Sequence, residues 1–249
     1  MSEMDHQTTI IAIDSSGLVA SVAVLTQEKV IAEYSVDYKK THSQTLVPML
    51  REITEMIELD MADVDAIAIA KGPGSFTGLR IGSATAKGLG FALDKPLIPV
   101  GTLAGLAYNA YGHGGWIVPV MDARREQVYT GIYRFDGGEL VTVMEQDALG
   151  IEELIEKINA MTGESHVLFL GDAVPVYKDK IEAGMKVPFA FAPPHMNRQR
   201  AASVGALALT YYREGKIESA DAHRPEYIRK SSAERELEGK KNADHPADA

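Results

Sequence analysis

The sequence predicts an α/β fold of two related lobes, each with a mixed sheet flanked by helices. Short apolar runs typical of strands alternate with longer runs in which apolar residues recur at helical spacing. A strand, an aspartate, a polar turn and a second strand occur twice, around Asp14 and around Asp122, an offset of 108 residues. Three glycines within residues 112–115 separate the two occurrences and do not favour a continuous helix. We therefore place a lobe boundary at these glycines.

The first half contains the pattern of a sheet with parallel and antiparallel strands. Five short runs predict strands, the second and third antiparallel: 9–13, 19–25, 29–36, 64–70 and 96–100. Residues 43–57 and 79–93 predict helices, because their apolar residues recur every three or four positions. Ser43 is expected to cap the first helix, and Thr102 to cap a helix after the last strand. The strand–helix–strand order around 79–93 implies parallel strands.

The second half repeats this alternation and then changes in composition. Three runs predict strands: 116–121, 127–135 and 167–171. Three stretches predict helices: 151–161, 175–183 and 200–212. We therefore expect an N-terminal lobe over 1–111 and a C-terminal lobe over 116–230. Residues 231–249 hold five acids, three basic residues and one leucine, too little apolar surface to order a segment, and we expect a disordered tail.

The composition predicts a soluble, cytoplasmic protein. The chain has 249 residues, 45% of them hydrophobic, and a mean hydropathy of −0.09. No run approaches the roughly 18 apolar residues of a membrane span, and the polar N-terminus does not resemble a secretory signal. Cysteine is absent, which excludes disulfides and thiolate chemistry. The net charge of −10 repels phosphate backbones, so nucleic acid is not expected to bind this chain by itself.

A glycine-rich loop over residues 72–78 joins a predicted strand to a predicted helix. Backbone N–H groups at such a position can bind an anion. The Walker pattern requires Lys and Ser or Thr after its last glycine, whereas Leu79 and Arg80 follow here. The dinucleotide fingerprint G-x-G-x-x-G is one residue shorter than this loop. Two interpretations stay open, a phosphate site and a tight turn whose glycines are needed for positive φ.

Polar residues near the predicted strand ends suggest a degenerate nucleotide pocket. Facing carboxylates at strand ends can hold Mg²⁺ with a nucleotide, and serine hydroxyls can donate to phosphate. The residues after Asp122 lack a glycine that would let a phosphate approach, and a turn-capping role for each aspartate stays open. The candidates are Asp14, Ser15, Ser75, Thr77, Asp122 and Arg124. No cofactor is firmly expected, and ATP or ADP with Mg²⁺ is the only one that these residues suggest.

The sequence predicts neither catalytic residues nor a metal site. No two of the seven histidines lie within ten residues of each other, so local metal-ligand spacing is absent. Ser75 does not lie in a G-x-S-x-G nucleophile elbow, because Pro73 and Thr77 occupy the glycine positions.

The helix predicted over 79–93 is apolar on two faces, and the first-half sheet covers only one. Small residues repeat every four positions at Gly82, Ala86 and Gly90, which leaves a groove for a second helix. Dense packing inside this chain is the alternative. We predict a partner interface on one face of this helix: Leu79, Gly82, Ala86, Leu89 and Gly90.

Four segments resemble the motifs of the bacterial TsaB (YeaZ-type) proteins and occur in the same order: 13–16, 72–82, 121–129 and 225–229. The eleven-residue loop GPGSFTGLRIG is the most specific of them. The resemblance implies an actin-like (ASKHA, RNase H-like) fold related to Hsp70 and the sugar kinases. It also implies a role in making threonylcarbamoyladenosine beside the anticodon of tRNAs that read codons beginning with A. The fold relatives include proteins labelled peptidase M22-like.

The resemblance further implies a non-catalytic scaffold or activating subunit. Its expected partners are a catalytic paralogue of the same fold (TsaD-type) and a small ATPase (TsaE-type). When the chain is alone, we expect it to form a homodimer. We expect it to contact tRNA only through the complex and not to associate with a membrane. The helix interface at 79–93 agrees with such pairing. The alternatives are a stand-alone nucleotide-binding enzyme, ATPase- or kinase-like, and an M22-type metallopeptidase.

Overall fold

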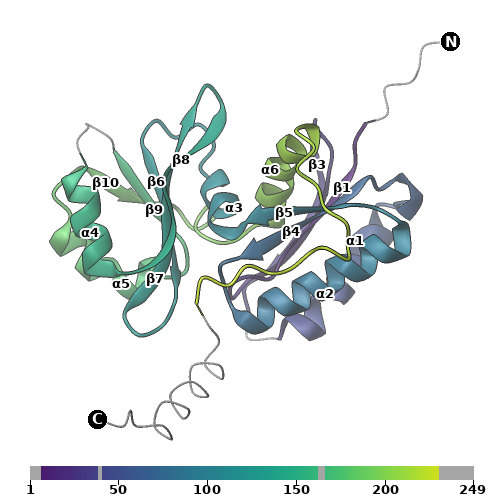
Figure 1. The fold of residues 1–249 in the computed structure, drawn as a ribbon, viewed down its shortest axis with the longest axis horizontal. Helices are drawn as coiled ribbons and strands as arrows, with labels where there is room; N and C mark the ends of the chain where they lie inside the picture. The colour runs from purple at the N-terminus through teal and green to yellow at the C-terminus, as the bar shows by residue number, and fades with distance from the viewer. Residues whose placement is uncertain (1–6, 39–40, 162–165, 230–249) are drawn as a thin grey trace, which may run out of the picture.

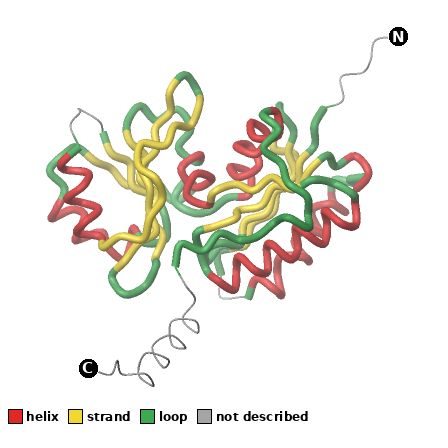
Figure 2. The backbone as a smooth tube through the Cα atoms, in the orientation of Figure 1, coloured by secondary structure: helices red, strands yellow, loops and turns green. Residues whose placement is uncertain are grey.

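The computed structural model describes residues 7–38, 41–161 and 166–229, and they form two α/β lobes side by side (Figure 1). Strands lie in the middle of each lobe and helices cover them (Figure 2). The predicted disordered tail, 231–249, lies outside the described residues. Within the described ranges, no helix has the length and apolar character needed to cross a membrane.

The first lobe is built on a five-stranded mixed sheet of order β3-β2-β1-β4-β5. Its strands are β1 Ile10–Asp14, β2 Ala20–Leu25, β3 Val30–Val36, β4 Ala66–Gly72 and β5 Leu97–Gly101. β1 pairs antiparallel with β2, and β2 with β3, whereas β1, β4 and β5 run parallel. The predicted parallel strands on either side of the helix at 79–93 are therefore confirmed.

The second lobe repeats this topology with the order β10-β9-β6-β7-β8. Its strands are β6 Trp116–Asp122, β7 Gln127–Asp136, β8 Glu139–Gly150, β9 Val167–Leu170 and β10 Phe189–Phe191. β6 pairs antiparallel with β7 and parallel with β9, as β1 does with β2 and β4. Asp14 and Asp122 end the two equivalent central strands. The predicted fold of two related lobes with mixed sheets is confirmed.

Each sheet has one face covered by a pair of helices from its own half of the chain. The pairs are α1 His42–Met56 with α2 Phe76–Leu93, and α4 Ile151–Ala160 with α5 Val174–Gly184; the 3-10 turn η1, Met61–Asp63, precedes β4. α1 buries Leu46 and Ile53 against Ile11 and Ile67 of the first sheet. α4 buries Leu154 and Ile158 in the corresponding core of the second lobe. Apolar residues at helical spacing therefore position both pairs.

The two lobes exchange their third helices. α3, Thr102–Tyr108, follows β5 of the first sheet, yet Leu103 and Leu106 pack in one core cluster with Ile117 and Met121 of the second sheet. α6, Ala201–Arg213, follows β10, yet Val204 and Leu207 are buried on β1 and β2 of the first sheet. The two helices also contact each other where the lobes meet (Figure 1).

This exchange corrects the predicted lobe ranges, 1–111 and 116–230, which follow chain order. Residues 201–213 belong to the core of the first lobe. The segment after them also returns to that lobe, because Glu218 forms a β-bridge with Leu97 of β5. Local sequence patterns predict that α6 is a helix, but they do not say which of two apolar sheets it covers.

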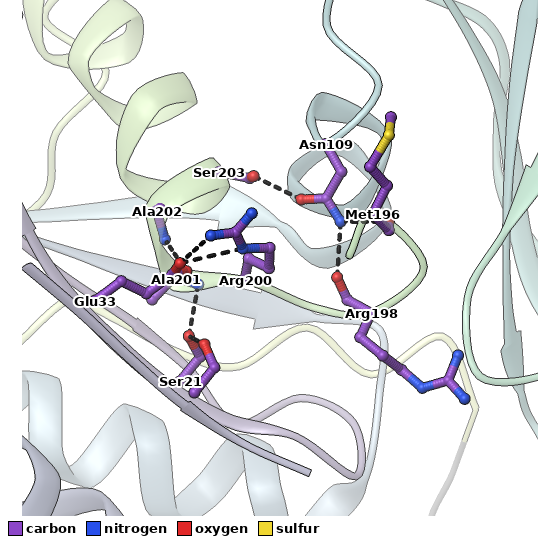
Figure 3. A network of polar contacts seen from close by, with 10 residues as sticks. Ser21, Glu33, Asn109, Met196, Arg198, Arg200, Ala201, Ala202 and Ser203 are labelled. Carbon is purple, nitrogen blue, oxygen red and sulfur yellow. Dashed lines mark hydrogen bonds and ion pairs between the residues drawn. The ribbon is translucent and has the colours of Figure 1, made fainter. Parts of the chain in front are cut away.

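A polar network holds the chain where it crosses back from the second lobe to the first (Figure 3). Asn109, just after α3, donates through Nδ2 to the carbonyl oxygens of Met196 (2.8 Å) and Arg198 (2.7 Å). Its Oδ1 accepts from Ser203 Oγ of α6 at 2.5 Å. The Asn109 side chain therefore joins the segment that leaves the first lobe after α3 to the segment that returns to it before α6.

The start of α6 is fixed to the edge of the first sheet by the same network (Figure 3). The Arg200 guanidinium pairs with the Glu33 carboxylate of β3. That carboxylate also accepts from the N–H of Ala202 at 3.1 Å, and the Ser21 hydroxyl accepts from the N–H of Ala201 at 2.8 Å. Side chains of β2 and β3 thus cap α6 from outside the helix.

The C-terminal strap, residues 214–229, runs along α2 and then reaches the second lobe (Figure 1). Its Tyr227 ring stacks on Phe76 at the start of α2, with centroids 4.7 Å apart. Glu226 accepts from Lys71 Nζ of β4 (2.8 Å) and from Gln146 Nε2 of β8 (2.7 Å). Arg229 donates to the Ala123 carbonyl oxygen in the β6–β7 turn at 2.8 Å. The strap is therefore a second connection between the lobes.

Two cap predictions are wrong and two strands were not predicted. Thr41, not Ser43, precedes α1, and its side chain makes no capping bond. Thr102 is the first residue of α3, and its Oγ1 accepts from the Gly72 N–H instead. β8 is an edge strand whose polar residues hide the apolar alternation, and β10 has only three residues.

Asn109→Ala is expected to lower the free energy of unfolding by about 2 kcal/mol or more, because it removes three hydrogen bonds and leaves partly buried carbonyls without a donor. Ser203→Ala removes only one of these bonds and should cost less. Urea unfolding of both variants measures the difference. Equal stability of Asn109→Ala and the wild-type chain would show that the crossing does not depend on this side chain.

Candidate functional site

The glycine-rich loop packs directly on the turn that follows β1. The N–H of Ser75 donates to the carbonyl oxygen of Ser16 at 2.7 Å. A Cβ added at Gly74 would collide with that same oxygen, and a Cβ at Gly78 would collide with the carbonyl oxygen of Ser15. Gly72 also adopts a φ of +128°, which favours glycine. The glycines thus serve a tight turn and a close approach between two backbone segments.

Two of the hydroxyl groups that could donate to a phosphate, those of Ser15 and Ser16, already donate to acceptors within the chain. Ser15 Oγ donates to the carbonyl oxygen of Gly78 at 2.9 Å. The N–H and Oγ of Ser16 both donate to Asp14 Oδ1, at 2.9 and 2.6 Å. Ser75 is the N-cap of α2, and its Oγ accepts from the Gly78 N–H at 3.3 Å. Thr77 is exposed on the first turn of α2.

Asp14 is buried at the bottom of this turn, with 1% of its surface exposed. Burial raises the pKa of its carboxyl group to about 6, against the opposing effects of the two Ser16 hydrogen bonds and the nearby His42. The carboxylate therefore acts as the acceptor of an Asx-type turn. This is the turn-capping interpretation that the sequence left open for Asp14.

Gln199 and His42 enclose the same turn at Gly17. His42 Nε2 donates to the Gly17 carbonyl oxygen at 2.9 Å. Gln199 is 1% exposed, and its Nε2 lies 2.7 Å from where a Gly17 Cβ would be. Both amide atoms of Gln199, and His42 Nδ1, lack a hydrogen-bond partner among the described residues. Gln199 therefore fills the approach to the turn, and no sequence motif signalled it.

Asp122 and Arg124 bind each other in the equivalent turn of the second lobe. Asp122 Oδ1 accepts from the Arg124 N–H at 2.8 Å, and Oδ2 pairs with the Arg124 guanidinium at 3.1 Å. The N–H of Asp122 donates to Asp172 Oδ1 at 3.1 Å, and burial raises the pKa of Asp172. Arg124, Arg125 and Glu126 all adopt positive φ. Arg124, a candidate for the nucleotide pocket, thus pairs with the neighbouring Asp122.

The geometry brings some of the predicted pocket residues together and leaves others apart. Asp14, Ser15 and the backbone of Ser75 meet at the first-lobe turn, whereas the side chains of Asp122 and Arg124 pair with each other in the second lobe. At the first-lobe turn, Ser15 and Ser16 donate to acceptors of this chain, and the buried Gln199 amide lies beside Gly17. In the described ranges, three or more His, Asp or Glu side chains do not gather as a metal site.

The predicted interface face of α2 lies in the core of this chain, so this prediction is wrong. Leu79 and Ala86 are 2% and 0% exposed. A Cβ at Gly82 would collide with Ser15 Oγ, and one at Gly90 would lie 3.0 Å from Ala220 Cβ of the C-terminal strap. Leu89 is partly buried. The small residues admit the β1 turn and the strap, which is the alternative of dense packing within the chain.

A different face of α2 points outward. We call it the outer face of α2 and define it by Thr77, Arg80, Ala84, Gly88 and Phe91, all of them exposed. Phe91 is 61% exposed, and apart from the neighbouring backbone of α2 no described atom lies within 4 Å of a Cβ built on Gly88. Glycine inside a helix costs roughly 0.5–1 kcal/mol relative to alanine. Contacts among the described residues give no reason for this cost at Gly88.

Asp14→Asn is expected to become more stable than the wild-type chain as pH rises. The folded chain holds the Asp14 proton up to about pH 6, whereas the unfolded chain releases it near 3.8. Ionisation therefore lowers the wild-type free energy of unfolding between these values, and the loss remains at higher pH. Asparagine cannot ionise but keeps an oxygen acceptor for Ser16. Urea unfolding should favour the variant by about 2 kcal/mol more at pH 7.5 than at pH 4.5. If the difference in free energy of unfolding between variant and wild type were the same at both pH values, the raised pKa of the buried Asp14 carboxyl would be contradicted.

Gly78→Ala and Gly88→Ala are expected to have opposite effects, although both glycines lie in α2. The Gly78 variant must displace the Ser15 carbonyl oxygen and should lose about 1–3 kcal/mol. The Gly88 variant meets open space and should gain about 0.5–1 kcal/mol. Urea unfolding of the two proteins under one condition makes the comparison. If Gly78→Ala were as stable as the wild-type chain, the loop would not pack on the turn as described.

Comparison with known proteins agrees with this architecture. The family model described as "TsaD: tRNA N6-adenosine threonylcarbamoyltransferase" matches residues 29–237. The tRNA threonylcarbamoyladenosine biosynthesis protein TsaB of Bacillus subtilis (strain 168) is 36% identical over 228 residues, 91% of this chain and 96% of that protein. TsaB of Escherichia coli (strain K12) is 28% identical over 234 residues, 93% of this chain and 99% of that protein.

The solved structure of YeaZ from Pseudomonas aeruginosa superposes with a TM-score of 0.76 at 28% identity, covering 88% of this chain and 99% of that one. The similarity spans both lobes and confirms the resemblance seen in the four motifs. The fold is accordingly the actin-like two-lobe fold of YeaZ, and the chain belongs to the TsaB family of tRNA threonylcarbamoyladenosine biosynthesis proteins.

Proposed function

We propose that this chain is a non-catalytic subunit that pairs with a TsaD-type catalytic paralogue and activates it. The reaction served is the transfer of a threonylcarbamoyl group to N6 of the adenosine beside the anticodon, in tRNAs that read codons beginning with A. One observation carries the proposal: the turn where this fold would bind a phosphate is closed by the chain itself. Ser15 and Ser16 donate to Gly78 and Asp14, and Gln199 fills the approach.

The chain's contribution is therefore a surface, and the outer face of α2 is the best candidate. Ala84 and Gly88 are small, exposed and one turn apart, so a second helix can approach closely there. Such a close approach would explain why the chain has a glycine at position 88 despite its cost to the stability of the helix. Phe91 then supplies apolar contact area at the end of the same face.

The proposed assembly follows from one shared fold. A paralogue with the same lobes presents an equivalent helix pair, so α1 and α2 of this chain meet their counterparts; without the paralogue, a second copy takes its place. A TsaE-type ATPase and tRNA then contact this chain only as part of the complex. The complex works in the cytoplasm and does not associate with a membrane. Because the hydroxyls of Ser15 and Ser16 are bonded within this chain, we assign nucleotide binding to its partners.

Gly88→Leu tests the proposal by filling the outer face of α2. The variant should melt slightly above the wild-type chain, because leucine favours a helix more than glycine does and no side chain of the described residues lies within 4 Å of a Cβ at this position. Its dissociation constant for the TsaD-type paralogue should rise at least tenfold, and threonylcarbamoyladenosine formation with paralogue, ATPase and tRNA should fall in parallel. Ala160→Leu, at an exposed position on α4 of the other lobe, is the matched control and should change neither quantity.

Two outcomes would contradict the proposal. The first is that titration calorimetry detects no binding of the wild-type chain to the paralogue. The second is that the isolated chain turns over ATP with Mg²⁺, or cleaves a peptide, without any partner. These are the activities of the stand-alone enzyme and of the metallopeptidase, and nothing in the described residues favours either.

A further inference from the structure

An open pocket of about 430 Å³ lies at the C-terminal end of α2, between the helix and the C-terminal strap. Phe91 of α2, Pro96 before β5 and Ile217 and Ala220 of the strap form its apolar walls. Phe91 is 61% exposed and Ile217 is 45% exposed, so two large apolar side chains face solvent across one hollow. A hollow with apolar walls is the usual place for the anchoring side chain of a partner.

The pocket is already formed, because its strap wall is fixed to the first lobe. The backbones of Leu97 and Glu218 exchange two hydrogen bonds of 2.9 Å. Lys87 Nζ donates to the carbonyl oxygens of Asp221 and His223, both at 3.3 Å. The buried His223 ring lies 2.6 Å from Glu218 through Nδ1. A preformed pocket needs little ordering when it is filled, which favours affinity.

The rim of the pocket is mainly acidic. Asp94, Glu218 and Asp221 line the pocket, and Lys95 is the one basic side chain among the described residues that do so. The Glu218 carboxylate is bonded to His223, so Asp94 and Asp221 are the acids free to meet a partner. Complementary charge on the partner favours a fast and specific encounter. The rim therefore suits an apolar side chain that is flanked by lysine or arginine.

The pocket continues the outer face of α2. Phe91 belongs to both, and Gly88 lies three residues, about 4.5 Å along the helix axis, before it. A helix that packs along Ala84 and Gly88 thus reaches the pocket within its next turn. We propose that this pocket receives one apolar anchor, an aromatic or leucine side chain with basic neighbours, from the TsaD-type paralogue. This inference rests on the pairing proposed above and adds where the partner is held and by what chemistry.

Substitutions in the strap, away from α2, test the pocket separately from the helix face. Ile217→Asp places a charge on the apolar wall and should weaken binding of the paralogue at least tenfold. Asp221→Lys changes only the exposed rim; it should slow association several-fold and reduce the dependence of the association rate on salt. Val176→Asp, at a 62% exposed position on α5, is the matched control and should bind like the wild-type chain. Titration calorimetry and stopped-flow association provide the two readouts.

The outcomes separate this inference from the proposed function. If the wild-type chain binds the paralogue and Gly88→Leu weakens that binding, while Ile217→Asp and Asp221→Lys bind normally, the pairing stands and the pocket inference is wrong. If the strap variants lose only self-association and still bind the paralogue normally, the pocket binds a second copy of this chain and the proposed paralogue anchor is wrong. If the wild-type chain does not bind the paralogue, both proposals fail. Should Ile217→Asp not fold, Ile217→Ala combined with Asp221→Lys, both in the strap, decides instead.

Discussion

The exchange of α3 and α6 between the two sheets is the constraint on which this structure depends. Neither sheet can cover both faces with helices from its own half of the chain, so each lobe requires the other. Asn109 holds the two crossings together by bonding Met196, Arg198 and Ser203 at once. The Glu226 and Arg229 contacts of the C-terminal strap add a second connection. In many proteins of two lobes a ligand closes the cleft between them; here the chain's own side chains already occupy the junction.

The same packing explains why a glycine-rich loop is present in a protein proposed to bind no nucleotide. Gly74, Gly78 and Gly82 let the loop and the first turns of α2 approach Ser15 and Ser16 more closely than any side chain would allow. The close approach buries Asp14 and raises the pKa of its carboxyl group. A motif that looks like an anion site thus stabilises the contact between α2 and the first sheet. With one face of α2 fixed in this way, only its outer face remains for a partner.

Much of the fold could be predicted from the sequence, because strand and helix periods are local properties. The duplication was visible in the offset between Asp14 and Asp122, and the parallel strands followed from the strand–helix–strand order. The exchange of α6 was not visible, because an apolar helix face does not reveal which sheet it covers. For the same reason, the two apolar faces of α2 could not be ranked, and the face with Ala86 was assigned to a partner although it lies in the core. Gln199 belongs to no sequence motif. It lies beside the turn after β1 only because the segment before α6 returns to the first lobe at that point.

Hydrogen–deuterium exchange of the isolated chain, with and without millimolar Mg²⁺–ATP, tests the central claim most directly. The claim is that residues 14–17 and the loop 72–78 are closed on each other, so their amides have no phosphate to bind. The account predicts slow exchange at the bonded amides of Ser16, Gly72, Ser75 and Gly78, and no change in either segment when Mg²⁺–ATP is added. Fast exchange that becomes protected by the nucleotide would show an open phosphate site, and would contradict both the closed turn and the non-catalytic role built on it.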